Sequence, residues 1–143
     1  MAGVEFYSGV LCAGFVNAHS HIELSYLRGA IAEGGGYASF AESIAKVRDN
    51  FSEEERLSAI VEADRAMWQE GVDAVGDIVN SETSFATKAT SEIHYHNFLE
   101  VFGLRVCNLE RQRELLKYPN TSLTLHSVYS VQDAPFREVC QAD

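Results

Sequence analysis

The sequence predicts an α/β fold with a parallel sheet, corresponding to about the first four βα units of a (β/α)8 TIM-type barrel. Two observations predict this fold. Short apolar segments alternate with segments of helical periodicity four times along the 143 residues, and no Asn-Gly hairpin turn joins two apolar segments. Polar residues also gather where the apolar segments end, which is the usual place for chemistry in parallel α/β proteins.

The first unit begins with residues 9–18, an apolar stretch that is too short for a helix in a globular domain and therefore predicts a buried strand. A loop follows and ends at three consecutive glycines, residues 34–36. Residues 38–51 then have helical spacing, with an apolar stripe formed by Phe40, Ile44 and Val47.

The second unit contains the best-marked helix. Ser52 and Glu55 form a capping-box pattern, apolar residues keep a helical period from Leu57 to Trp68, and Gly71 is a natural C-terminal cap. Residues 72–80 predict a short buried strand, and a weak helix is expected within residues 82–92.

The remaining segments continue the alternation. They predict a strand over residues 94–103, a modest helix over 108–117, a strand over 122–130, and a last helix that begins at Ser130 and Asp133. Four βα units are half of a (β/α)8 barrel, which typically needs roughly 250 residues. Since no linker interrupts the pattern, we expect residues 1–143 to form a single partial barrel domain.

Composition limits the function classes. The 11 basic and 21 acidic residues give a net charge of −10, which argues against binding to nucleic acid or to an anionic membrane. No apolar run approaches the ~18 residues of a membrane span, and the N-terminus lacks the pattern of a signal peptide. Three widely spaced cysteines predict reduced thiols in a cytoplasmic protein, with Cys12 as a buried small apolar residue.

Two histidines at the end of the first predicted strand form a candidate metal site. Side chains alternate along a strand, so His19 and His21 project to the same side, about 6.5–7 Å apart. Two neutral imidazoles at this spacing can converge on one divalent ion such as zinc or iron. The alternative is a pair of histidines at the mouth of the sheet, hydrogen-bonded to carbonyls or water.

The segment that contains these histidines, VLCAGFVNAHSHIELSYLRG (10–29), resembles the first barrel strand of metal-dependent amidohydrolases. The similarity is to the chlorohydrolase and aminohydrolase branch, with deaminases of adenosine or aminodeoxyfutalosine type as the first members to consider. Supporting matches follow in order: GVDAVGDIVN for the second strand, FLEVFGLR for the third and LHSVYSV for the fourth. Two positions depart from the family pattern, because Ala13 and Val128 stand where prolines are usual.

The resemblance implies a function and roles for individual residues. It implies hydrolytic deamination of a purine-like or other cyclic amidine by a metal-activated water, with zinc as the expected metal and iron as the alternative. His19 and His21 would be metal ligands, and His126 would hydrogen-bond the substrate. Glu23 and Glu100 would lie at the barrel mouth as substrate-binding candidates, with a surface position for Glu23 and a structural hydrogen bond for Glu100 as the alternatives.

We expect structural roles for four other polar residues. Asp77 and Asn80 are expected to cap the following helix rather than to touch substrate. A second His-x-His pattern, His94 and His96, lies at the start of a strand and therefore at the end of the sheet opposite the candidate site. We expect a structural or solvent-facing role for this pair.

The family's catalytic set is incomplete in this sequence. The resemblance implies a third histidine ligand and a proton-shuttling glutamate from a His-x-x-Glu on strand five, another histidine from strand six and an aspartate from strand eight. No His-x-x-Glu motif occurs, and only about a dozen residues precede the first strand, where the family usually has part of a β-sandwich. We therefore expect a fragment of a deaminase with little activity on its own and no assigned catalytic residue.

Two other functions stay open. The first is a non-catalytic half-barrel that binds a metal or a partner, for example as a homodimer that closes an eight-stranded ring. The second is a flavodoxin-like α/β domain in which the His-x-His pattern is incidental. In the leading hypothesis the partner is a small-molecule substrate.

Overall fold

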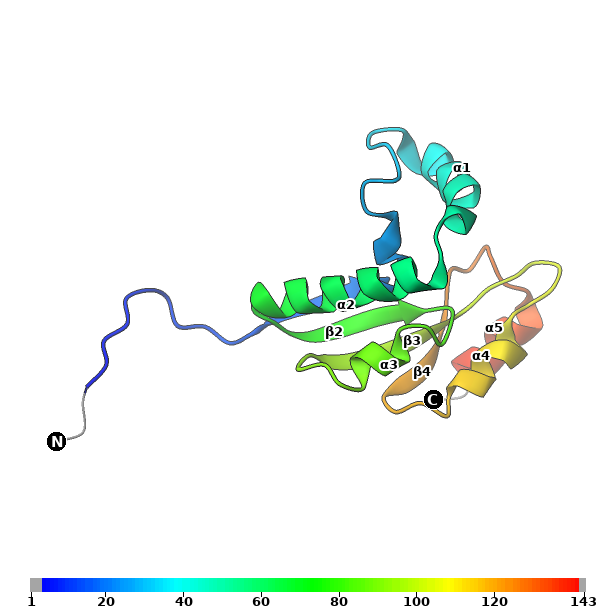
Figure 1. Ribbon diagram of the computed structural model, residues 1–143. Coiled ribbons are helices and arrows are strands. Elements are labelled where there is room, and N and C mark those ends of the chain that lie inside the picture. Colours follow the sequence, from blue (N-terminus) through cyan, green and yellow to red (C-terminus); the bar gives the residue numbers. More distant parts are fainter. Residues whose placement is uncertain (1–3, 142–143) are drawn as a thin grey trace.

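The computed structural model describes residues 4–141 and contains one parallel sheet with the strand order β1-β2-β3-β4. Its strands are β1 (Phe15–Ser20), β2 (Val72–Val79), β3 (His94–Val101) and β4 (Thr121–Leu125). Each strand pairs in parallel with the next along the chain, so each connection crosses over the sheet and carries helical structure. This arrangement confirms the predicted α/β fold of four βα units of a partial barrel (Figure 1).

Helical segments fill every connection. They are η1 (Ile22–Leu27), α1 (Gly36–Val47), η2 (Arg48–Asn50), α2 (Glu53–Gln69), α3 (Phe85–Lys88), α4 (Leu109–Leu115) and α5 (Asp133–Cys140). The predicted capping box starts α2, because Ser52 Oγ accepts from the Glu55 amide at 3.2 Å and the Glu55 carboxylate accepts from the Ser52 amide at 2.7 Å. Gly71 has φ +83° and directly follows Glu70, the C-cap residue of α2, at the helix end predicted from the sequence. In residues 4–141 no helix is both long enough and apolar enough to span a membrane.

The core lies between the sheet and its helices. On β3 the odd-numbered residues from Tyr95 to Val101 are buried, whereas the even-numbered residues from His94 to Glu100 are exposed or half-buried. Tyr95 packs in a cluster with Ile60 of α2, so the odd-numbered face is the helix-covered one. The even-numbered face, which we call the open face, corresponds to the interior side of a closed barrel.

The first strand is shorter than predicted. Residues 9–14 are exposed, with Val10 and Leu11 at 93% and 101%, and β1 begins only at Phe15. The reason is the register, because Phe15 pairs with Val72, the first residue of β2, and no strand lies beside the preceding residues. The expectation that Cys12 is buried was therefore wrong, since Cys12 is exposed.

Two further boundaries differ from the prediction. β4 ends at Leu125 rather than residue 130, and α5 begins at Asp133 with Gln132, not Ser130, as its N-cap. The stripe on α1 also fails to reach the core, since no residue of α1 is buried and Phe40 is 48% exposed. Helical periodicity predicts an amphipathic helix but not which surface that helix meets.

Candidate metal and substrate site

A bulge in β1 determines how the two histidines are presented. Asn17 pairs with Val75 and Ser20 pairs with Asp77. Between these two pairs β1 therefore contains one residue more than β2. An extra residue of this kind bends a strand and re-aims its side chains. The rings of His19 and His21 lie 5.2 Å apart between centroids, at an interplanar angle of 65°. The sequence prediction that these rings share a side is therefore consistent with the structure.

The electrostatics of His21 favour a neutral ring. Its side chain is half-buried, and this burial lowers the pKa of His21 below its ordinary value of 6.5 because the charged form loses solvation. The negative charge of Glu100 acts in the opposite direction, while His19 adds to the lowering. A neutral imidazole has a free lone pair and is the form that ligates metals.

The histidine pair supplies two candidate nitrogen donors for a metal. Within residues 4–141 no group of three or more histidine, cysteine, aspartate or glutamate side chains is arranged to hold a metal ion. The two imidazoles suit zinc or iron in chemistry, but these metals take four or more ligands. The described residues thus fit a divalent metal as two of its ligands and leave the other positions to groups from elsewhere.

A cavity of about 760 Å³ lies at the carboxyl end of the strands. Its lining includes all three residues predicted to bind substrate: Glu23, Glu100 and His126. These residues come from η1, β3 and the segment after β4, so only the tertiary structure brings them together. His19 and His21 are not part of the lining, although the charges of Glu100 and His126 act on His21.

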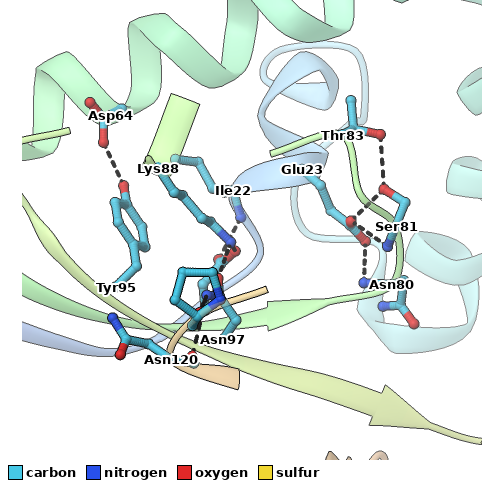
Figure 2. A network of polar contacts seen from close by, with 12 residues as sticks. Ile22, Glu23, Asp64, Asn80, Ser81, Thr83, Lys88, Tyr95, Asn97 and Asn120 are labelled. Carbon is cyan, nitrogen blue, oxygen red and sulfur yellow. Dashed lines mark hydrogen bonds and ion pairs between the residues drawn. The ribbon is translucent and has the colours of Figure 1, made fainter. Parts of the chain in front are cut away.

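Glu23 is tied to the loop that follows β2. Its carboxylate accepts hydrogen bonds from the amides of Asn80 and Ser81, both at 3.1 Å, and from Ser81 Oγ at 2.9 Å. Burial raises the pKa of Glu23 above its ordinary value of 4.5, and the hydrogen bond from Ser81 opposes the rise. Glu23 therefore joins two segments of the chain (Figure 2), and it also lines the cavity.

Glu100 and His126 also have defined partners. Glu100 Oε2 accepts from Asn80 Nδ2 at 2.9 Å, which is the structural hydrogen bond considered for it from the sequence. His126 Nδ1 lies 3.0 Å from Ser130 Oγ and 3.2 Å from Ser127 Oγ. The ring of His126 is exposed at the cavity, so it is accessible to a ligand there.

The expectation that Asp77 and Asn80 cap the following helix was wrong. Asp77 is 0% exposed and forms a buried ion pair with Lys88 of α3, at 2.6 Å between Oδ2 and Nζ. Asn80 lines the cavity, and Ser84 is the N-terminal boundary residue of α3. Asp77 has the same strand parity as Val75 and Val79, so its face had to be the buried one.

The second His-x-His pattern lies away from this site, as predicted. His94 is the first residue of β3, and both His94 and His96 are exposed on the open face. His96 Nε2 lies 2.8 Å from Ser122 Oγ of β4. The strand direction thus places this pair at the end of the sheet opposite His21 and Glu100.

Sequence reasoning missed the polar residues that hold the site together. Lys88 donates to Asp77 and to Asn97, and Ser81 donates to Glu23. A signal was available for one of them, because a charged residue on the buried face of an apolar strand requires a partner of opposite charge. Nothing in the sequence indicated that the partner would come from α3.

Comparison with solved structures identifies a similar fold. The chain matches no protein-family model, and no curated protein is significantly similar to it in sequence. It is similar to aminofutalosine deaminase of Helicobacter pylori crystallised in complex with methylthio-coformycin, with a TM-score of 0.76 and 26% identity over 90% of this chain. A second structure of the deaminase gives a TM-score of 0.70 at 24% identity, again over 90% of this chain. The chain spans 34% and 32% of the two deaminase chains, and it therefore has the fold of about one third of such an enzyme.

Proposed function

We propose that this chain supplies the first four βα units of a metal-dependent hydrolase that deaminates a purine-like or other cyclic amidine. His19 and His21 are two ligands of a divalent metal, which we take to be zinc from the chemistry of the donors. Glu23, Glu100 and His126 line the pocket for the substrate. The function is that of the complete barrel, and the described residues provide one side of its site.

One observation carries this proposal. Two histidine rings lie 5.2 Å apart at the carboxyl end of β1, and two residues that line a cavity at that end of the sheet, Glu100 and His126, act electrostatically on His21. This end of parallel strands is where (β/α)8 enzymes hold their active sites. The structural similarity to one third of a deaminase supports the same interpretation.

The residues present have separable chemical tasks. A bound divalent metal would act as a Lewis acid that activates the water displacing the amino group. His19 and His21 contribute neutral nitrogen donors, and burial of His21 keeps it in that form at neutral pH. His126 offers a ring nitrogen to a polar atom of the substrate, and Asn80 holds the Glu100 carboxylate at 2.9 Å beside it.

Zinc binding to the purified chain tests the proposal. Isothermal titration with zinc should give one binding event per chain, and His19→Ala or His21→Ala should abolish it because two imidazole donors cannot be reduced to one without losing the site. The matched control is His94→Ala, which breaks a His-x-His pattern of the same spacing at the opposite end of the sheet. Zinc binding that survives His19→Ala and His21→Ala but disappears in His94→Ala would contradict the assignment.

An activity measurement examines the same proposal from another side. The purified chain with zinc should release little ammonia from adenosine-like compounds. Within residues 4–141 no three metal-ligating side chains are arranged to hold an ion, and the family resemblance assigns the proton-shuttling glutamate to a His-x-x-Glu motif that this sequence lacks. Ammonia release at ordinary turnover that depends on His19 would mean that these residues suffice for catalysis.

A second candidate function rests on the edges of the sheet. In residues 4–141, β1 and β4 each pair with a strand on one side only, and edge strands present unpaired backbone groups. Two copies of a four-stranded half-barrel could pair β1 of one copy with β4 of the other and close an eight-stranded ring. In that case the chain is a metal- or partner-binding homodimer without catalysis.

A further inference from the structure

We propose that Asp77 and Glu23 are positioning residues for His21, holding the two residues that follow it against the end of β2. The inference rests on the proposed function in treating His21 as a metal ligand. Neither carboxylate needs to contact the metal or the substrate for this role. Together with their partners we call them the His21 clamp, which consists of Ile22, Glu23, Asp77, Asn80, Ser81 and Lys88.

The first anchor of the clamp is a backbone hydrogen bond. The amide of Ile22, the residue immediately after His21, donates to Asp77 Oδ1 at 2.8 Å. Ile22 is 2% exposed and Asp77 is 0% exposed, so water does not compete for this bond. The bond joins residues 55 positions apart and fixes the chain where it leaves β1.

Lys88 pairs with Asp77 and orients its carboxylate. Its Nζ donates to Asp77 Oδ2 at 2.6 Å and to Asn97 Oδ1 at 2.7 Å, which leaves Oδ1 of Asp77 directed at Ile22. Figure 2 shows Lys88 reaching toward Ile22 and Asn97 from a different element. Because a buried carboxylate without a cation is costly, Lys88 is what allows an aspartate to serve as this anchor.

The second anchor holds the next residue. The carboxylate of Glu23 accepts from the amides of Asn80 and Ser81 and from Ser81 Oγ, so both of its oxygens are bonded. Ser81 Oγ also lies 2.9 Å from Thr83 Oγ1, which fixes the hydroxyl (Figure 2). Residues 22 and 23 are thereby attached to the last residues of β2 and to the loop that follows it.

His21 needs such a clamp because of where it lies. β1 is an edge strand, its ladder to β2 ends at the pair Ser20 and Asp77, and His21 lies just beyond that pair. His21 has φ −133° and ψ 69°, outside the regular strand and helix regions, and η1 begins directly after it. A ligand at a junction of this kind is free to rotate with its backbone unless both sides are fixed. Outer groups that orient a ligand typically affect metal affinity strongly.

Two double variants test the first anchor without leaving a buried charge. Asp77→Asn with Lys88→Met retains an acceptor for the Ile22 amide, whereas Asp77→Leu with Lys88→Met removes it and has nearly the same size. We expect the Leu variant to change the nuclear Overhauser contacts between the rings of His19 and His21 in the metal-free chain. Its zinc affinity should fall by roughly 10- to 100-fold relative to the Asn variant.

The matched control is Val139→Ala. It truncates a buried side chain of α5 that packs with Val101, Leu109 and Val131, and no residue of this cluster belongs to the clamp. Val139→Ala should lower stability without moving the ring contacts or the zinc affinity. This separates positioning from a general loss of stability.

The outcomes distinguish the inference from the function on which it rests. Equal ring contacts and equal zinc affinity in the Leu and Asn variants would overturn the clamp. Ring contacts that change only in the Leu variant, in a chain that binds no zinc, would support the clamp and contradict the proposed function. If the Leu variant does not fold, Glu23→Met tests the second anchor because it removes both acceptor oxygens, and unchanged ring contacts and zinc affinity there would overturn the inference.

Discussion

At the scale of single residues, the carboxylates differ in burial and in their hydrogen-bond partners. Asp77 is fully buried and ion-paired, whereas Glu23 and Glu100 are both half-buried; Glu23 has both oxygens hydrogen-bonded and Glu100 has one. Asp77 and Glu100 lie within predicted strands and Glu23 follows one. The sequence separated Asp77, as an expected helix cap, from Glu23 and Glu100, but it did not indicate the buried ion pair of Asp77 or the hydrogen bonds of Glu23.

Glu23 gives a pH-dependent prediction at this scale. Its pKa is raised in the folded chain, so the folded state keeps the proton over a pH range where the unfolded state has lost it. This contribution to stability is fully present below the ordinary pKa of 4.5 and is lost as pH rises through the raised value. The free energy of unfolding of the wild type minus that of Glu23→Gln should therefore decrease as pH rises from 4 to 7, measured by urea denaturation. A difference that increases over this range would contradict the raised pKa.

At the scale of elements, the helices differ in how much of their surface is buried against the core. α2 carries its own start signal in Ser52 and Glu55, and its Ile60 is 0% exposed in a cluster with Val75 and Tyr95. α1 has an equally regular apolar stripe but buries no residue. Local sequence signals predicted both helices, and only packing distinguishes them.

This difference predicts unequal effects of truncation. Ile60→Ala should lower the free energy of unfolding by about 2–5 kcal/mol, because it leaves a cavity in a packed cluster. Phe40→Ala, on a side chain that is 48% exposed, should lower it by about 0.5 kcal/mol or less. Urea denaturation of both variants with a common slope measures the two effects, and a larger effect for Phe40→Ala would mean that α1 packs on the core in solution.

At the scale of the whole molecule, the sheet has two free edges and one open face. β1 and β4 are the outer strands, and β1 is preceded by exposed apolar side chains such as Phe6 and Leu11, at 91% and 101%. In a longer barrel, later strands would pair with both edges and enclose the open face. In a homodimer, the strands of a second copy would pair with both edges and enclose the open face.

The mass of the chain in solution distinguishes these arrangements. If the proposed function is right, the purified chain should be a monomer by size-exclusion chromatography with light scattering, because its edges match strands of a longer barrel and not one another. A stable dimer that carries zinc, and loses it on His21→Ala, would favour the homodimer instead.

The sequence by itself determined the order of strands and helices and the parallel sheet, and it proposed His19 and His21 as metal ligands. The order of elements depends on periodicity and capping, which are local, and the α2 capping box expresses them within a few residues. The tertiary structure alone decided where β1 begins, that Asp77 pairs with Lys88, and that Glu23, Glu100 and His126 line one cavity. The physical reason is that a strand needs a neighbour, a buried charge needs a partner, and a cavity needs several elements, all of which come from distant parts of the chain.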